Sequence, residues 1–327
     1  MNPSTKLLAN SLIIITLFLA GCKTSPPIGD TADDQGGALN PAPSTNSETT
    51  INNDVSEPSL GTFYLGKFHL FDREVNGWDE SGWAVILPSE DSRLIYVSSS
   101  SGNDTTGLVV SPSSVLDIND PSAIKPFKTI EAALRQVRNG YPDWILLRRG
   151  DKWSVSEIIS VKGGRSVYER AVITSYGSSS QRPMLLIESK NGLRIWSDIN
   201  FVAIVGLALY AEQRDPVSSQ FLGWGNVDNR AGIYSYQAPG EVKKAILLED
   251  NDINYFSGGI TLTGEGRIED VVIRRNIVRN SYSELSHSQG FFASNASVLL
   301  EENIFDHNGW YKQQIGDGND PSEGQAT

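Results

Sequence analysis

The chain has 327 residues, of which 39% are hydrophobic and 9% aromatic, so it can bury a sizeable core in one or two domains. Its formal net charge is −12. This balance argues against nucleic acid as a partner, because phosphate binding needs clustered basic side chains. The single cysteine, Cys22, excludes an intrachain disulfide.

Residues 1–21 predict a lipoprotein signal peptide. A basic residue, Lys6, precedes the largely apolar run Leu7–Leu19, which has the layout of a secretory signal and is short for a membrane span. The closing sequence Leu19-Ala20-Gly21-Cys22 resembles the bacterial lipobox. That resemblance implies lipidation of Cys22, a membrane partner through the lipid anchor, and a place in the cell envelope, at the outer membrane or cell surface. The alternative is a plain signal peptide with an incidental cysteine.

Two segments separate this signal from the main domain. Residues 22–59 are rich in Ser, Thr, Pro and Asn, which predicts a disordered tether. Residues 60–93 carry aromatic side chains, including Trp78 and Trp83, and we expect a flap packed on the first coil of the domain. Sugar binding by these aromatics is the alternative.

The main domain is expected over residues 94–310. It opens with a strand at Leu94–Ser98. Apolar residues at helical spacing then predict a helix over Glu131–Arg138, and Asp143–Leu147 predicts a second strand.

A short pattern recurs around Asn251, Asn276 and Asn303, which are 25 and 27 residues apart. Each copy has an apolar residue, two polar residues, the Asn, and an apolar residue two positions further on. This indicates strand, bend and strand, with the Asn tolerating the left-handed conformation of a tight bend. Stacked Asn side chains can also hydrogen-bond in a ladder. Leu207 occupies the Asn position one coil earlier, so the ladder should begin after it.

A glycine column supports the same periodicity. Gly192, Gly232, Gly259 and Gly290 each begin an alternating segment, with spacings of 40, 27 and 31 residues. With the Asn column, this gives three strands per turn and predicts an all-β fold, a right-handed parallel β-helix. Ordinary sandwich strands are the alternative.

The opening of the domain resembles the right-handed β-helix proteins of the pectate-lyase-like superfamily. The residues that carry the resemblance are Tyr96-Val97-Ser98, Gly102-Asn103-Asp104, Pro126-Phe127-Lys128-Thr129-Ile130, Ala132-Ala133-Leu134, Ile145-Leu146-Leu147-Arg148 and Gly150-Asp151. The resemblance implies an N-terminal capping helix and a polysaccharide partner. It specifies activity poorly, because one fold hosts many functions.

Alternation along the glycine column predicts one outward face. Residues one and three after each Gly should point inward, and those two and four after should point outward. The outward set is Arg194, Trp196, Tyr234, Tyr236, Thr261, Thr263, Phe292 and Ser294. Aromatic side chains on a solvent face favour a binding surface for sugar rings. The long insertion 211–230, with Trp224 and Arg230, and the loop that carries His287 are expected to lie beside this face. Coverage of the face by the flap or an insertion is the alternative.

Lyase chemistry on a uronate needs a cation to neutralise the carboxylate and a base to remove the α-proton. Arg194 and Arg230 are candidate neutralisers. The candidate bases are His287, Lys243 and Lys244. The resemblance implies Ca²⁺ as another neutraliser, but no cofactor is certain from the residues. The carboxylates lie at corners and are expected to be solvated: Glu249, Asp250, Asp252, Glu301 and Glu302. His307 is expected to be structural. No complete acid–base set is evident.

Three functions remain open from the sequence: an enzyme resembling polysaccharide lyases, a glycan-binding or adhesive module, and a structural surface protein. The last coil, Gly290–His307, is followed only by polar sequence, and we assign residues 311–327 as a polar tail. Either a partner chain covers this end of the coil, or the chain is shorter than its relatives.

Overall fold

The computed structural model describes residues 63–65, 67–70, 73–77, 83–115, 117, 124–188, 191–283 and 287–311, with the backbone alone at 63–77 and 310–311. The signal segment, Cys22, the tether and nearly all of the polar tail lie outside these ranges, so what the sequence predicts for them stays a prediction. Within the described ranges, no helix has the length and apolar character to cross a membrane.

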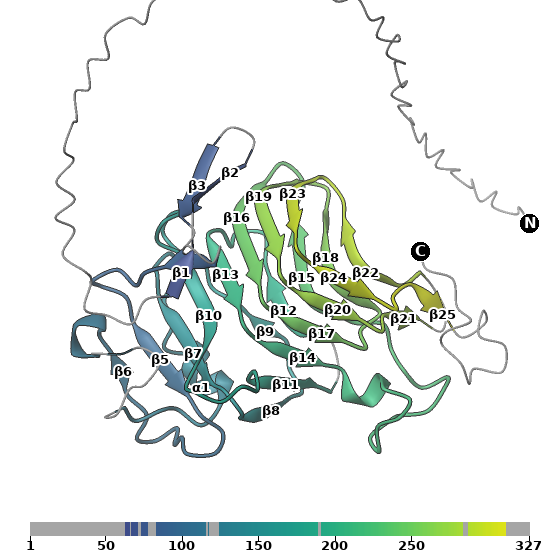
Figure 1. The fold of residues 1–327 in the computed structure, drawn as a ribbon, viewed down its shortest axis with the longest axis horizontal. Helices are drawn as coiled ribbons and strands as arrows, with labels where there is room; N and C mark the ends of the chain where they lie inside the picture. Colours follow the sequence, from purple (N-terminus) through teal and green to yellow (C-terminus); the bar gives the residue numbers. More distant parts are fainter. Residues whose placement is uncertain are drawn as a thin grey trace, which may run out of the picture. The chain divides into compact units, whose positions relative to one another are not determined.

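Three sheets run along the domain (Figure 1). The largest has eight strands in the order β23-β19-β16-β13-β10-β7-β5-β6, namely β5 (Leu94–Val97), β6 (Val109–Val110), β7 (Trp144–Arg148), β10 (Ala171–Tyr176), β13 (Val202–Val205), β16 (Val242–Glu249), β19 (Arg267–Arg274) and β23 (Ala296–Glu301). The six-stranded sheet has the order β24-β20-β17-β14-β11-β8, namely β8 (Lys152–Val155), β11 (Met184–Ile187), β14 (Ala208–Tyr210), β17 (Asp252–Asn254), β20 (Ile277–Arg279) and β24 (Ile304–Asp306). The five-stranded sheet has the order β22-β18-β15-β12-β9, namely β9 (Ile159–Ser160), β12 (Leu193–Ile195), β15 (Ala231–Gln237), β18 (Gly258–Gly264) and β22 (Gln289–Ala293).

The remaining elements are short. Two-stranded pairs join β1 (Phe63–Leu65) to β4 (Ala84–Ile86), β2 (Lys67–Leu70) to β3 (Arg73–Gly77), and β21 (Tyr282–Ser283) to β25 (Trp310–Tyr311). The helical elements among the described residues are α1 (Ile130–Leu134) and the 3-10 turns η1 (Pro112–Ser114) and η2 (Glu212–Arg214).

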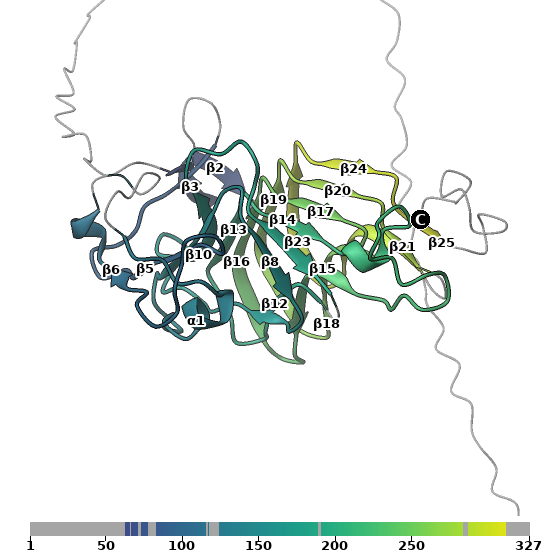
Figure 2. The ribbon, with the colours of Figure 1, turned by 90° about the horizontal axis from the view of Figure 1, so that it is seen from below.

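Successive turns of the chain add one strand to each of the three sheets. Corresponding strands of neighbouring coils pair in parallel, as β10 and β13 do. Figure 2 shows β14, β17, β20 and β24 stacked in this order along one side. The six-stranded sheet contains one strand for each of six coils in the described part of the chain. The prediction of an all-β parallel β-helix is therefore confirmed.

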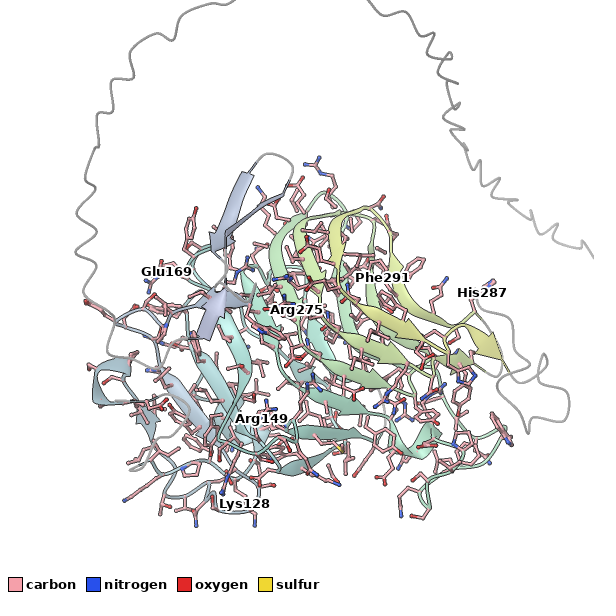
Figure 3. All side chains as sticks on the ribbon, in the orientation of Figure 1. Lys128, Arg149, Glu169, Arg275, His287 and Phe291 are labelled. Carbon is pink, nitrogen blue, oxygen red and sulfur yellow. The ribbon has the colours of Figure 1, made fainter. Side chains whose placement is uncertain are left out.

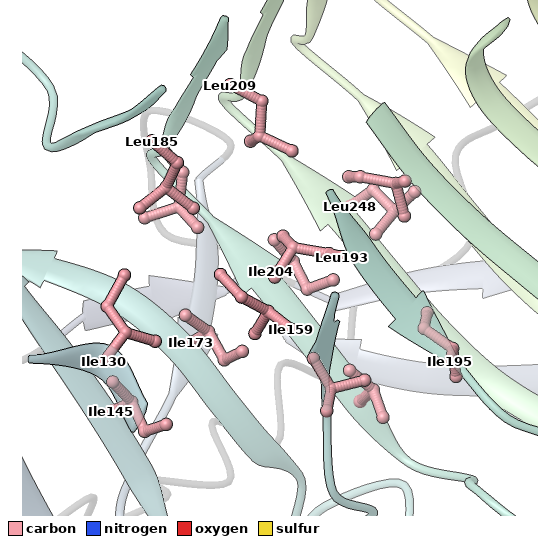
Figure 4. Packing of buried hydrophobic residues seen from close by; sticks show 14 of the residues in the cluster. Ile130, Ile145, Ile159, Ile173, Leu185, Leu193, Ile195, Ile204, Leu209 and Leu248 are labelled. Atoms are coloured by element: carbon pink, nitrogen blue, oxygen red, sulfur yellow. The ribbon is translucent and has the colours of Figure 1, made fainter. Parts of the chain in front are cut away.

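The interior of the coil is apolar. Inward side chains from the three sheets meet there, and Leu193, Ile204 and Leu248 are fully buried (Figure 4). Two parallel strands must be joined by a crossover connection. Here the rest of each coil is that connection, and it brings the chain back beside the strand that it left. Each coil thus buries its apolar side chains against the coils before and after it.

Helix α1 closes the N-terminal end of this interior. Its buried residues Ile130, Ala132 and Ala133 join the core beside Ile145 (Figure 4). The Oγ1 of Thr129 accepts a hydrogen bond from the backbone N–H of Ala132 at 3.2 Å and caps the helix. The capping helix is confirmed but shorter than the predicted Glu131–Arg138. The backbone N–H of Arg138 bonds instead to the Asp143 carboxylate at 2.9 Å, which draws the chain out of the helix.

The Asn ladder is present, with one correction. Nδ2 of Asn251 donates to Oδ1 of Asn276, and Nδ2 of Asn276 donates to Oδ1 of Asn303, each at 3.0 Å. The backbone N–H of Leu207 bonds to Oδ1 of Asn251, so the ladder starts one coil after Leu207, as predicted. The left-handed residue is not the Asn. It is the residue before each Asn: Asp250, Arg275 and Glu302, with φ between 53° and 58°. The Asn faces inward because its amide must reach the backbone of the neighbouring coils.

The glycine column is explained by close approach between coils. A Cβ built on Gly192 would lie 2.5 Å from the carbonyl oxygen of Gly232, and one built on Gly259 would lie 2.4 Å from that of Gly290. None of these glycines has a positive φ. The column therefore marks the corner where one backbone passes directly over the next, which no larger residue permits.

The flap lies on a different face from the glycine column. Ala84 and Ile86 are buried on the outer side of the eight-stranded sheet, in a cluster that includes Leu247 and Val272. The ring of Trp83 lies under the guanidinium of Arg275, 4.3 Å from its centroid. The prediction that the flap packs on the first coil is thus too narrow, because its partners extend to later coils. The flap side chains that the structure describes therefore pack on the eight-stranded sheet.

Candidate functional site

The outward face of the five-stranded sheet has the predicted alternation. Leu193, Ile195, Ile233, Ile260 and Leu262 are fully buried. Between them, pairing in register places one row of outward residues across four coils: Arg194, Tyr234, Thr261 and Phe292. Ala293, expected to point inward, is exposed because its strand belongs to the last coil described.

A cavity of about 280 Å³ opens at the edge of this sheet where β15, β18 and β22 begin. Five residues singled out from the sequence line it, and six more residues complete its walls. The lining residues are Asn191, Asn229, Arg230, Ala231, Tyr234, Ser257, Gly258, Thr261, His287, Gln289 and Phe292. His287 is exposed and lies in the loop that leads into β22 (Figure 3). Residues more than 100 positions apart in the chain therefore share one cavity because the coils stack.

Arg230 lines the cavity, but its guanidinium is already occupied. Its Nη1 donates to the carbonyl oxygens of Ile187, at 3.0 Å, and Glu188, at 2.5 Å. Its Nε donates to Oδ1 of Asp228 at 2.7 Å, and Nη2 also contacts that carboxylate. The Arg230 side chain is 1% exposed. The expectation that Arg230 neutralises a substrate carboxylate is therefore not supported, because its charge is balanced by Asp228 and its donors bind the protein.

Arg194 forms a shelf beside the cavity with two aromatic residues. Its guanidinium carbon lies 4.3 Å from the ring centroid of Trp196 and 5.4 Å from that of Tyr234. The indole Nε1 of Trp196 donates to Oγ of Ser160 at 3.3 Å, and the Trp196 side chain remains 43% exposed. Arg194, Trp196 and Tyr236 share the outward face but do not line the cavity. Stacking on two rings orients the Arg194 cation without a carboxylate partner among the described residues.

The insertion 211–230 forms a wall held by buried anchors. Arg214 is fully buried, and its Nε donates to the carbonyl oxygen of Tyr255 at 2.7 Å, while its guanidinium lies 4.4 Å from the ring centroid of Tyr282. Asp215 accepts a hydrogen bond from the hydroxyl of Tyr210 at 2.5 Å. Burial, with this bond, raises the pKa of Tyr210. The insertion was expected to form a wall of the site, and its last residues, Asn229 and Arg230, do line the cavity.

Trp224 belongs to this anchoring and not to the cavity. Its ring meets those of Phe221 and Tyr282 edge to face, at centroid distances of 5.4 and 5.6 Å. The side chain packs the insertion against β21. The hypothesis that Trp224 binds substrate therefore has no support in its position, since it is absent from the cavity lining.

The two lysines proposed as bases lie elsewhere. Lys243 is fully buried inside the coil, where Nζ donates to Ile195 O at 2.7 Å, Ser235 Oγ at 2.9 Å and Tyr236 O at 3.1 Å. Burial lowers the pKa of Lys243 to about 7. Lys244 is exposed and lies 4.0 Å from Glu269. Neither lysine lines the cavity, so among the candidate bases only His287 does.

The corner carboxylates are paired with arginines. Glu249 is 1% exposed, which corrects the expectation of a solvated corner, and its Oε1 lies 3.2 Å from Nη1 of Arg274. Burial raises the pKa of Glu249 to about 7. Asp250 pairs with Arg182 at 2.5 Å, and Asp252 pairs with Arg279 at 2.8 Å. In the described part of the chain, no group of three His, Cys, Asp or Glu side chains is arranged to hold a metal ion.

His307 was expected to be structural, and two residues of the cavity were not singled out from the sequence. His307 lies at a corner with φ 53°, and its Nδ1 is 3.0 Å from Oδ1 of Asn280, so it has the structural contact expected of it. Asn191 and Gln289 were missed. Each immediately precedes a glycine of the column, and this shared position was the available signal.

No family model matches the chain, and no curated protein matches it. Among solved structures, the selenomethionine derivative of GH136 lacto-N-biosidase from Eubacterium ramulus has a TM-score of 0.42 at 14% identity over 65% of this chain and 41% of that one. The native form of that protein has a TM-score of 0.39 at 14% identity, over 65% of this chain and 36% of that one. A rhamnogalacturonan lyase has a TM-score of 0.31 at 10% identity, over 66% of this chain and 51% of that one. This chain therefore spans about half the length of these structures or less, and its function has to be argued from its own side chains.

Proposed function

We propose that this protein binds carbohydrate in the cavity beside the five-stranded sheet. The observation that carries the proposal is the row Tyr234, Thr261 and Phe292, whose outward side chains all line that cavity. Aromatic rings provide flat apolar faces for the C–H side of a sugar ring, and amide or hydroxyl groups around them bond its hydroxyls. A binding function is favoured over glycoside hydrolysis, which uses two carboxylates, because no described Asp or Glu lines the cavity.

The test compares two tyrosines on the same strand. Tyr234 and Tyr236 both point outward from β15 and are both half-buried, but only Tyr234 lines the cavity. We expect Tyr234→Ala to weaken binding of an oligosaccharide identified on a glycan array by about tenfold or more, the equivalent of 1.4 kcal/mol. Tyr236→Ala should change the affinity by less than about twofold. Equal losses in both variants, measured by calorimetry, would place the ligand elsewhere on the face.

A second candidate function is a β-elimination, supported by His287 and Tyr234 lining the same cavity. In this reading His287 removes the α-proton of a uronate, and the Tyr234 hydroxyl protonates the leaving oxygen. The product is unsaturated and absorbs in the ultraviolet. His287→Ala should abolish its formation and leave oligosaccharide binding in place. Absence of such a product on uronate polymers, with and without added Ca²⁺, would leave the binding function alone.

We further propose that the protein works in the cell envelope, tethered by a lipid on Cys22. The support is the lipobox resemblance of Leu19-Ala20-Gly21-Cys22 and the polar tether that follows. Cys22→Ser should release the protein from the membrane fraction and prevent incorporation of a labelled fatty acid. Retention of the variant in that fraction would contradict the anchor.

A further inference from the structure

Among the described residues that line the cavity, no arginine or lysine carries an unpaired charge. Arg230 is the basic side chain of this described set, and it is neutralised by Asp228 and anchored on the carbonyl oxygens of Ile187 and Glu188. A carboxylate entering the cavity would have to compete with Asp228 for this guanidinium. It would also lose its own hydration without a new ion pair, which is costly.

Besides His287, the polar side chains that line the cavity and that the structure describes with open hydrogen-bonding positions are amides and hydroxyls. Oδ1 of Asn191 accepts from the backbone N–H of Ala231 at 2.8 Å, which fixes the amide and leaves its Nδ2 as a donor. Gln289 is half-buried and adds a second side-chain amide, and Thr261 adds a hydroxyl. Amides and hydroxyls both donate and accept, which matches the hydroxyl groups of an uncharged sugar.

The aromatic residues set the shape of this surface. Thr261 lies between Tyr234 and Phe292 in the register of β15, β18 and β22. Since neighbouring strands are about 4.8 Å apart, the two aromatic residues lie about 10 Å apart with the smaller threonine between them. The result is a saddle with apolar sides and a polar floor, suited to a single pyranose ring.

Arg194, a cation that could pair with the carboxylate of an acidic sugar, lies outside the cavity. Arg194 precedes Tyr234 in the row, on the side away from Thr261, and its guanidinium is stacked on the rings of Trp196 and Tyr234. The net charge of −12 also repels a polyanion at long range. We infer that the cavity is specific for an uncharged sugar residue and discriminates against the corresponding uronate. This inference rests on the proposed carbohydrate-binding function and names its ligand class.

The experiment uses the full chain and matched pairs of oligosaccharides that differ only at C6, such as oligogalactose with oligogalacturonate, oligomannose with oligomannuronate, and oligoglucose with oligoglucuronate. Affinities are measured by calorimetry at low and at physiological salt. We expect one neutral member to bind at least about tenfold more tightly than its uronate, with an affinity that salt changes by less than about twofold. Gln289→Ala should weaken that binding about fivefold or more, whereas Arg194→Gln should leave it unchanged.

A gain-of-function variant keeps the test independent of simple loss of folding. Gln289→Lys places a cation in the cavity and should raise the affinity for the uronate relative to its neutral partner. Tighter, salt-sensitive binding of a uronate to the unaltered protein, abolished by Arg194→Gln, would overturn the inference and leave the carbohydrate-binding function standing. Failure of every pair to bind would instead overturn the proposed function, and the inference with it.

Discussion

The side-chain amide of Asn251 donates to the amide oxygen of Asn276 at 3.0 Å, and the same oxygen accepts the backbone N–H of Asn251, also at 3.0 Å. Nδ2 of Asn276 in turn bonds the carbonyl oxygen of Leu248 at 2.9 Å. One buried amide therefore satisfies backbone groups of its neighbouring coil as well as the next amide. The coils are joined by polar contacts inside the corner, in addition to the apolar core.

Asn276→Ala should lower the free energy of unfolding by about 2–4 kcal/mol, because it leaves the Asn251 N–H and the Leu248 carbonyl buried without this partner. Asn303→Ala is the matched control. Asn303 lies at the end of the described ladder and is half-buried, so we expect a loss of about 1 kcal/mol. Urea unfolding followed by circular dichroism measures both. Equal losses would show that the amide at position 276 has no special place in the ladder.

Gly259→Ala should be among the most damaging single substitutions. Its Cβ would lie 2.2 Å from Cγ1 of Val278 and 2.4 Å from the carbonyl oxygen of Gly290, so two coils would have to separate. We expect a loss of about 3 kcal/mol or more. Gly240→Ala is the control, because Gly240 has φ +78° and open space around it. Its cost is that of a left-handed alanine, about 1 kcal/mol. A Gly259→Ala protein as stable as Gly240→Ala would refute the close approach of these coils.

Lys243 should make stability rise with pH. Burial lowers its pKa to about 7 from an ordinary value of 10.5, so between these values the unfolded chain holds a proton that the folded chain has released. The contribution is therefore complete above pH 10.5 and is lost as the pH falls through about 7. Between pH 7 and 9, wild type should gain up to about 1 kcal/mol per pH unit relative to Lys243→Met. Parallel stability curves for the two proteins would show that Lys243 does not titrate in this range.

Glu249 should have the opposite effect at lower pH. Burial raises its pKa to about 7 from 4.5, despite the nearby Arg274 and Arg275, so the folded chain binds the extra proton in this window. The contribution is complete below pH 4.5 and is lost as the pH rises through about 7. Thermal unfolding of Glu249→Gln should therefore show a flatter pH dependence between 4.5 and 7 than wild type does. Glu302→Gln, at an exposed neighbouring corner, should retain the wild-type slope across that window, and the two variants behaving alike would contradict this assignment.

The sequence was sufficient for the features that repeat. The Asn ladder and the outward row could be predicted because both follow from a local pattern that returns once per coil. The state of Arg230 could not be predicted. Two of its partners are backbone carbonyl groups more than 40 positions earlier in the chain. Every residue has such a group, so residue types do not show which carbonyls accept a hydrogen bond. Glu249 likewise lies in a polar segment that is typical of a solvated corner. Its burial depends on the pairing that places it beside Arg274 of the next coil, and on the flap.

The flap can pack on the domain only after later coils have folded. Ala84 and Ile86 pack with Leu247 and Val272, and Trp83 lies on Arg275, so the flap completes its contacts only with residues up to almost 200 positions later in the chain. During synthesis it must wait, with its apolar side uncovered, until the fifth coil has emerged and wound into place. Protection of the amides of residues 84–86 from hydrogen exchange would then report that the fifth coil has formed, because a chain that ends before residue 272 lacks part of the surface on which they rest.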